Sequence, residues 1–214
     1  MTPRVVILSA PSGGGKTTIT RSLLQRRTDL GFSVSATTRP PRDGEVDGVA
    51  YRFVPRPEFE RWVAAGDFLE WAEYAGNLYG TLKSEVERVQ RAGQHVLLDI
   101  EVQGARQVLR GCPPPRSISI FVLPPSGREW IDRLQGRHTE TSASLVQRLD
   151  QAVLEIRQSV GWQHIVINDD VERVVEEISA IIDADGLPRH APPPARLSSL
   201  VDELVAEADR LRHD

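Results

Sequence analysis

Residues 5–18 read Val5-Val6-Ile7-Leu8-Ser9-Ala10-Pro11-Ser12-Gly13-Gly14-Gly15-Lys16-Thr17-Thr18, and this stretch decides the fold. Aliphatic residues lead into a glycine-rich turn, which is followed by Lys-Thr at the start of a helical pattern. That order is typical of a buried β-strand, a phosphate-binding loop and a helix N-terminus. The backbone N–H groups of such a loop point into one concavity, where the helix dipole adds positive potential. The stretch therefore predicts a P-loop that binds a nucleotide.

The residue types in the loop indicate how it would bind ATP. Lys16 has the reach to contact the β- and γ-phosphates, and the hydroxyl of Thr17 can hold Mg²⁺. The motif departs from its usual form at the first position, where Ala10 replaces glycine. The added methyl group matters only if this residue needs a positive φ. The competing interpretation is a glycine-rich turn that arose by chance. The predicted ATP-binding residues of the loop are Ala10, Pro11, Ser12, Gly13, Gly14, Gly15, Lys16, Thr17 and Thr18.

The composition disfavours several classes of protein. The chain has 214 residues, enough for one compact domain with insertions, and a formal net charge of −4. That charge offers no basic field to nucleic acid or to a membrane surface. No stretch approaches the roughly 20 apolar residues of a membrane span. The single cysteine, Cys112, rules out an intrachain disulfide and fits a reducing compartment. We therefore expect a cytoplasmic protein with no nucleic-acid or membrane partner.

Short aliphatic runs alternate with helical patterns along the chain. The predicted strands are Val5–Leu8, Val96–Ile100, Ile118–Leu123 and Ile165–Ile167. Runs of this kind, each followed by a turn or a helix start, are typical of buried parallel strands. We therefore expect an α/β fold with a mostly parallel sheet flanked by helices. Ligands are expected at the carboxyl ends of the strands.

Three segments interrupt or extend this pattern. Strand-like runs at Phe32–Ala36, Val49–Val54 and Phe68–Tyr74, with a short helix near Glu58–Ala65, indicate a small, mostly β insertion. A polar stretch between two later helices is typical of a mobile lid. The predicted division is a core of residues 1–32 and 81–186, a lid at about 134–148 within it, an inserted subdomain at 33–80 and a tail at 187–214.

The tail combines a linker with a helix. Residues 187–194 are rich in proline, which predicts a stiff, extended linker. Beyond them apolar residues recur at helical spacing, and Ser199 followed by Asp202 resembles a capping box. A helix this short is marginal alone. We expect its apolar face to dock either on its own domain or on a second copy of the chain, as a homodimer.

Motifs inside and beyond the insertion resemble those of guanylate kinases. They are Phe32-Ser33-Val34-Ser35-Ala36-Thr37-Thr38-Arg39-Pro40-Pro41-Arg42-Asp43-Gly44-Glu45, Gly48-Val49-Ala50-Tyr51-Arg52-Phe53-Val54, Phe68-Leu69-Glu70-Trp71-Ala72, Asn77-Leu78-Tyr79-Gly80-Thr81, Leu98-Asp99-Ile100-Glu101-Val102-Gln103-Gly104-Ala105, Gly136-Arg137-His138-Thr139-Glu140-Thr141 and Ile167-Asn168-Asp169-Asp170. They occur in order over about residues 4–184. The resemblance implies a P-loop kinase with a GMP-binding insertion and a helical lid, which transfers a phosphoryl group from Mg²⁺-ATP to GMP.

The resemblance also implies a GMP site formed by the insertion. Arginines and tyrosine hydroxyls would grip the phosphate, because a guanidinium bonds phosphate oxygens in pairs. The carboxylate of Glu70 can accept from both N1–H and the 2-amino group of guanine, whereas adenine offers neither donor. Asp99 ends a predicted strand, where it would lie beside the nucleoside or hold Mg²⁺ through water, and the sequence leaves both roles open. The implied GMP-binding residues are Ser35, Arg39, Arg42, Tyr51, Glu70, Tyr79, Thr81 and Asp99.

On the donor side, the resemblance implies a lid that closes over ATP. Arg133, Arg137 and Arg148 would neutralise the ATP phosphates, and Asn168 would border the adenine. Phosphoryl transfer to a nucleotide needs charge neutralisation more than acid–base catalysis, so an arginine-rich site is expected. The implied catalytic residues are Lys16, Arg42, Arg137 and Arg148.

Two positions depart from the family pattern. Glu101 stands where Asp is common and gives a carboxylate with a longer reach, and His138 stands where a small residue or Asn is more usual. The change at Glu101 bears on the geometry of the water molecules around the metal, and the change at His138 bears on the closure of the lid.

Two other functions compete with the kinase. A guanylate-kinase-like domain can be a non-catalytic module that binds protein partners, typically with a degraded phosphate loop. A P-loop kinase for a ribose phosphate would not need Ser35, Glu70 and Thr81 to recognise a base. Gly13, Gly15, Lys16 and Thr17 of the loop are kept, and all three base-recognition residues are present. We therefore predict ATP-dependent phosphorylation of GMP, and also of dGMP, in purine nucleotide metabolism and GMP recycling.

Overall fold

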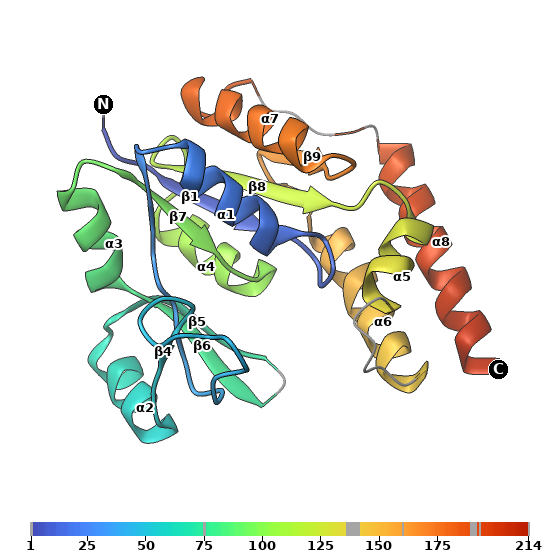
Figure 1. Cartoon of the computed structure of the whole chain (residues 1–214), viewed down its shortest axis with the longest axis horizontal. Helices are drawn as coiled ribbons and strands as arrows, with labels where there is room; N and C mark the ends of the chain where they lie inside the picture. The colour runs from blue at the N-terminus through green and yellow to red at the C-terminus, as the bar shows by residue number, and fades with distance from the viewer. Residues whose placement is uncertain are drawn as a thin grey trace. The chain divides into compact units, whose positions relative to one another are not determined.

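The computed structural model describes residues 2–74, 76–135, 142–159, 161–188, 192 and 194–213 (Figure 1). The chain divides into two compact units. The first unit consists of Met1–Ile7 and Leu24–Ile118, and the second consists of Leu8–Leu23 and Ser119–Asp214.

A five-stranded sheet has the order β2-β7-β1-β8-β9, in which β1 is Val5–Ser9 and β8 is Ser117–Leu123. In the first unit β2 (Leu30–Phe32) pairs in parallel with β7 (His95–Asp99). In the second unit β8 pairs in parallel with β9 (His164–Ile167). Every residue of β1 and β8 is buried. Strands covered on both faces have continuous aliphatic sequences, and the predicted α/β fold with a parallel sheet is confirmed.

The strand β2 differs from the prediction. The predicted strand-like run Phe32–Ala36 is not one strand, because Leu30–Phe32 belongs to the parallel sheet and only Ala36–Thr37 forms a strand (β3) of the other sheet. Three residues, one of them a glycine, are too few to show the alternation of apolar and polar residues that predicts a strand. Gly31 is needed for packing, since a Cβ there would overlap the side chain of Val89 on α3 (Lys83–Arg91). Only the neighbouring helix explains this glycine.

A second sheet of four strands has the order β4-β3-β6-β5. It joins β3 to β4 (Arg52–Phe53), β5 (Phe68–Tyr74) and β6 (Asn77–Leu82). The pair β3–β4 is parallel and the other pairs are antiparallel. Phe68 stacks on Phe59 of α2 (Arg56–Ala65), with ring centroids 4.4 Å apart. The sheet therefore has its own small core, while the predicted boundaries of the insertion stay a prediction.

The other helices pack against the strands of their own unit. In the first unit α3 contacts β7, and α4 (Val102–Gly111) contacts β5. In the second unit α7 (Val171–Asp183) contacts β9. Its N-terminus is capped by Asp170, whose carboxylate accepts from the backbone N–H of Arg173 at 2.9 Å. Three further helices are α1 (Lys16–Arg26), α5 (Gly127–Gln135) and α6 (Ser142–Gln158).

The C-terminal helix α8 (Pro194–His213) docks within the second unit. It packs against α6 and α5 and buries Leu200, Leu204 and Ala208. The predicted capping box at Ser199 and Asp202 is wrong, because the helix begins earlier, at a proline that suits a first turn whose N–H groups lack partners. Docking on its own unit fits the first of the two predicted arrangements, and a homodimer through this helix stays a prediction. Among the helices described here, none is long and apolar enough to cross a membrane.

Candidate active site

The P-loop connects β1 to α1 in the second unit. Gly13 and Gly15 have φ values of +84° and +90°, which side chains rarely adopt. The backbone N–H of Gly14 donates to the carbonyl of Pro11 at 2.9 Å and closes the turn. Among the residues that the structure describes, Asp185 is the one non-glycine residue with a positive φ. Ala10 therefore needs no such conformation, and its methyl group strains no backbone.

Three side chains from distant parts of the chain contact the loop. Asn168, which follows β9, donates its Nδ2 to the carbonyl of Gly14 at 2.8 Å. The indole Nε1 of Trp130 on α5 donates to the carbonyl of Ser12 at 2.7 Å. Arg148 on α6 donates its Nη2 to the hydroxyl of the same serine, also at 2.7 Å. The loop is thus held by residues from α5, α6 and the end of β9.

Asn168 also connects the loop to Arg133. The Nη2 of Arg133 donates to the backbone carbonyl of Asn168 at 3.0 Å. Both residues are predicted ATP-binding residues, and the structure brings them together beside the P-loop. Trp130 escapes prediction because an aromatic residue on an amphipathic helix resembles ordinary core. Arg137 and His138 lie outside the described residues.

Lys16 and Thr17 begin α1, where backbone N–H groups point toward an anion. Lys16 is half-buried and Thr17 is exposed. Among the described residues, no group of three or more His, Cys, Asp or Glu side chains is arranged to hold a metal ion. Mg²⁺ usually keeps several waters and binds through one or two protein groups plus substrate phosphates. An exposed threonine hydroxyl next to a phosphate loop fits that mode of binding.

Glu70 on β5 is a buried carboxylate in the first unit. Its side chain accepts from the hydroxyl of Thr81 on β6 at 2.6 Å, and the residue is 5 % exposed. Burial raises the pKa of Glu70 from 4.5 to about 7, while the Thr81 hydroxyl opposes the rise. A carboxylate is costly in such a buried place, so its position calls for a functional reason.

Helix α4 holds the strand that carries Glu70. The Nε2 of Gln107 donates to the carbonyl of Trp71 at 2.7 Å, and its Oε1 accepts from the Trp71 N–H at 3.3 Å. One turn earlier on the same helix, a Cβ added to Gly104 would overlap the carboxylate of Glu70. Gly104 and Gln107 thus position Glu70. Only Gly104 gave a sequence signal, as part of the Leu98–Ala105 motif.

Arg39 lies in a cluster with three aromatic rings, those of Tyr51, Phe53 and Tyr79, and a carboxylate. Its Nη2 contacts the Oε1 of Glu45 at 2.8 Å, which raises the pKa of the guanidinium further. Its Cζ lies 5.5 Å from the centroid of the Tyr51 ring, and that ring meets Tyr79 edge-on at 6.0 Å. The structure therefore brings together three predicted phosphate-binding residues, Arg39, Tyr51 and Tyr79.

Glu45 also shapes the turn that carries Arg42. Its Oε2 accepts from the backbone N–H of Arg42 at 2.8 Å, while the side chain of Arg42 is exposed. Ser35 is half-buried just before β3, and its carbonyl accepts from the Arg52 N–H at 2.9 Å. Asp99 is half-buried at the end of β7, and Glu101 is exposed. The roles of these residues stay predictions.

The ionisation of Glu70 gives folding stability a pH dependence with a definite sign. Because the pKa is raised from 4.5 to about 7 in the folded protein, the folded state keeps a proton that the unfolded state releases across this window. Stability is therefore lost as the pH rises through it. A Glu70→Gln variant cannot ionise. We expect its melting temperature to match that of the wild type near about pH 4.5 and to exceed it by about 3 °C or more at about pH 8.

Melting curves recorded from about pH 4.5 to about pH 8 would check this. The matched control is Glu73→Gln, an exposed glutamate on the same strand. A melting-temperature difference between wild type and Glu70→Gln that does not change with pH would contradict the assignment.

A parallel α/β sheet whose first strand ends in a glycine-rich loop and Lys-Thr defines a P-loop nucleotide-binding protein. The chain belongs to the guanylate kinase family, whose model matches residues 2–185. The resemblance predicted from the motifs is confirmed.

Individual relatives agree with this family over most of their length. A guanylate kinase of Rubrobacter xylanophilus is 48 % identical, over 84 % of this chain and 93 % of its own. One from Syntrophotalea carbinolica is 46 % identical, over 84 % of this chain and 85 % of its own. A crystal structure of guanylate kinase from Anaplasma phagocytophilum is similar with a TM-score of 0.71 and 32 % identity, covering 87 % of this chain and 88 % of that one. The helix α8 lies beyond the residues that the family model matches.

Proposed function

We infer that this chain is an enzyme that transfers the γ-phosphoryl group of ATP to GMP and releases ADP and GDP. Family membership carries this inference, and the buried carboxylate of Glu70 supports it. The P-loop keeps Gly13, Gly15, Lys16 and Thr17, which argues against a non-catalytic binding module. A buried carboxylate paired with the Thr81 hydroxyl argues against an acceptor without a base, such as a ribose phosphate.

In the reaction, a phosphate oxygen of GMP attacks the γ-phosphorus as the bond to the β-phosphate oxygen breaks. The leaving electron pair stays on ADP, and no general base is required, because the acceptor phosphate is largely dianionic near neutral pH. Lys16 and Arg148 would stabilise charge on the transferring group, with Arg137 and Arg42. Ser12, to which Arg148 donates, lies in the middle of the loop, so this guanidinium is already directed at the phosphate site.

On the acceptor side, Arg39, Arg42, Tyr51 and Tyr79 would hold the GMP phosphate. Glu70 would accept from N1–H and the 2-amino group of guanine, with Ser35, Thr81 and Asp99 beside it. We propose that dGMP is also a substrate.

The metal is proposed to be Mg²⁺, held by the hydroxyl of Thr17 and by ATP. It supplies positive charge that neutralises the β- and γ-phosphates. ATP and GMP are metabolites of the cytoplasm, and we propose that the enzyme acts there.

The inference is tested by measuring ADP formation with Mg²⁺-ATP against GMP, dGMP, AMP, CMP and UMP in parallel. Turnover confined to GMP and dGMP is the expected result. Comparable turnover with AMP would contradict the role of Glu70. No turnover with any acceptor, in protein that binds ATP by calorimetry, would contradict the activity itself.

A glycine-to-alanine change on α4 tests the position of Glu70. Gly104→Ala is expected to raise the KM for GMP about tenfold, because the new methyl group displaces the Glu70 carboxylate. The KM for ATP should stay unchanged. The control is Gly111→Ala at the end of the same helix, where an added Cβ meets nothing within 4 Å. Equal GMP KM values for the two variants would refute the predicted effect.

A further inference from the structure

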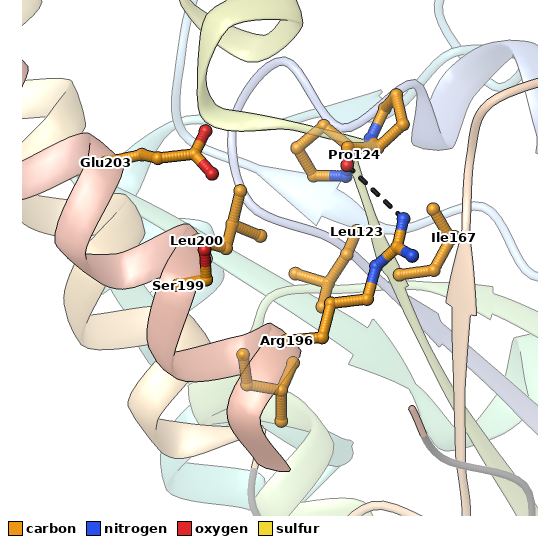
Figure 2. Close-up of a pocket in the computed structure, with 9 residues that line it drawn as sticks. Leu123, Pro124, Ile167, Arg196, Ser199, Leu200 and Glu203 are labelled. Carbon is orange, nitrogen blue, oxygen red and sulfur yellow. Dashed lines mark hydrogen bonds between the residues drawn. The ribbon is translucent and has the colours of Figure 1, made fainter. Parts of the chain in front are cut away.

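The C-terminal helix α8 contacts the second unit at the segment that leads into α5. Glu203 accepts from the backbone N–H of Gly127, the first residue of α5, at 2.8 Å. Seven positions earlier, the Nη2 of Arg196 donates to the carbonyl of Pro125 at 3.4 Å, which is the dashed line in Figure 2. The helix therefore holds the turn before α5 at two backbone groups.

The contact at Gly127 has the form of a helix cap supplied from elsewhere in the chain. The first N–H groups of a helix lack partners within it, and a carboxylate there also interacts favourably with the helix dipole. A Cβ added to Gly127 would lie 2.7 Å from both the Cβ and the Oε2 of Glu203, so only glycine fits so close to α8. Figure 2 shows Glu203 and Leu200 side by side on α8, at the edge of a cavity of about 290 Å³.

Other residues of α8 fix the helix independently of Glu203. Leu200, Leu204 and Ala208 are buried against the neighbouring helices. Near its end, Arg212 contacts both carboxylate oxygens of Asp150 on α6, at 2.5 and 2.7 Å. Glu203 is thus carried by a helix that is anchored elsewhere, and it can act as a fixed point for α5.

The helix that Glu203 caps also contributes contacts at the P-loop. Trp130 and Arg133, three and six positions after Gly127, reach the carbonyls of Ser12 and Asn168. A shift of α5 along its axis would move both side chains away from these two carbonyls.

We propose that Glu203 is a positioning residue for the ATP site: by capping α5 from α8, it holds Trp130 against the P-loop and Arg133 against Asn168, which itself bonds to the loop. Neither Glu203 nor α8 lies in the range that the family model matches, so this contact is a property of the chain's own C-terminal segment. The proposal rests on the proposed function only in taking ATP as the ligand of the loop.

Three substitutions of Glu203 separate the effect of the capping contact from the effect of the rest of α8. Glu203→Ala and Glu203→Asp remove or shorten the acceptor, and we expect each to weaken Mg²⁺-ATP binding about fivefold. Glu203→Gln keeps an oxygen at the same reach and should bind Mg²⁺-ATP within about twofold of the wild type. GMP affinity should be unchanged in all three. Calorimetry with Mg²⁺-ATP and with GMP measures these values at a temperature well below unfolding, and KM values provide a second readout.

The control is Glu207→Asp, which makes the same change one turn later on α8, at a residue that contacts Arg210 of the same helix. Wild-type ATP affinity in both Glu203→Ala and Glu203→Asp would overturn the proposal, as would an equal loss of GMP affinity. An equal loss of Mg²⁺-ATP affinity in Glu203→Gln and Glu203→Ala would contradict the role of Glu203 as a cap. If Glu203→Ala does not fold, the comparison of Asp with Gln decides. Because ATP binding is measured without phosphoryl transfer, failure of the proposed kinase activity would appear separately, as wild-type ATP binding without turnover.

Discussion

Arg148→Ala is expected to lower kcat about 10³-fold or more, because an arginine that stabilises the transferring phosphoryl group is worth on the order of 10³–10⁵ in rate. The side chain already donates to Ser12 in the middle of the P-loop. The proposed role of Arg148 puts its charge where negative charge accumulates during transfer. The KM for GMP should change little. Single-turnover and steady-state rates at saturating ATP and GMP would measure the loss.

The matched control is Arg157→Ala, which removes an exposed arginine from the same helix. Both variants should keep the circular dichroism spectrum of the wild type. If Arg148→Ala retains kcat within about threefold of Arg157→Ala, Arg148 is not a catalytic residue.

Glu70→Gln is expected to lower kcat/KM for GMP about 10³-fold, because two hydrogen bonds to a charged acceptor are lost. The amide nitrogen would instead face the N1–H and 2-amino donors of guanine. The activity with AMP should not fall, since adenine makes neither contact. The ratio of kcat/KM for GMP to that for AMP is the decisive measurement. The hydroxyl of Thr81 lies 2.6 Å from the Oε1 of Glu70 and holds that side chain in place. Glu70→Gln therefore changes the chemistry of the site with little change in its shape.

Glu73→Gln on the same strand provides the comparison for this variant, because its side chain is exposed. A GMP-to-AMP preference that survives in Glu70→Gln would assign base selection to other residues. The melting curves described above would show in the same samples whether the variant is folded. Higher stability together with lost selectivity would mean that the wild-type protein sacrifices stability for recognition of guanine.

Local features of the sequence were enough to predict the fold class and the family. Strand β1 and the P-loop could be predicted from residues adjacent in the chain. The strands β7, β8 and β9 could be predicted because a strand buried on both faces has a continuous aliphatic sequence, which is visible without knowledge of its neighbours. Glu70 and Arg39 were predicted as GMP-binding residues because the motifs of the insertion resemble those of guanylate kinases. Where a local pattern was ambiguous the prediction failed, as with the three-residue strand β2 and the capping box at Ser199.

Tertiary structure decided which side chains support the site. Trp130 reaches Ser12 across 118 positions, and Glu203 reaches Gly127 across 76. Gly104 is required only because Glu70 lies against it. The raised pKa of Glu70 is likewise a consequence of burial. The physical reason is the same in each case: desolvation, close packing and hydrogen bonds between distant residues arise when elements are brought together. A sequence displays the residue types but not the neighbours that they acquire.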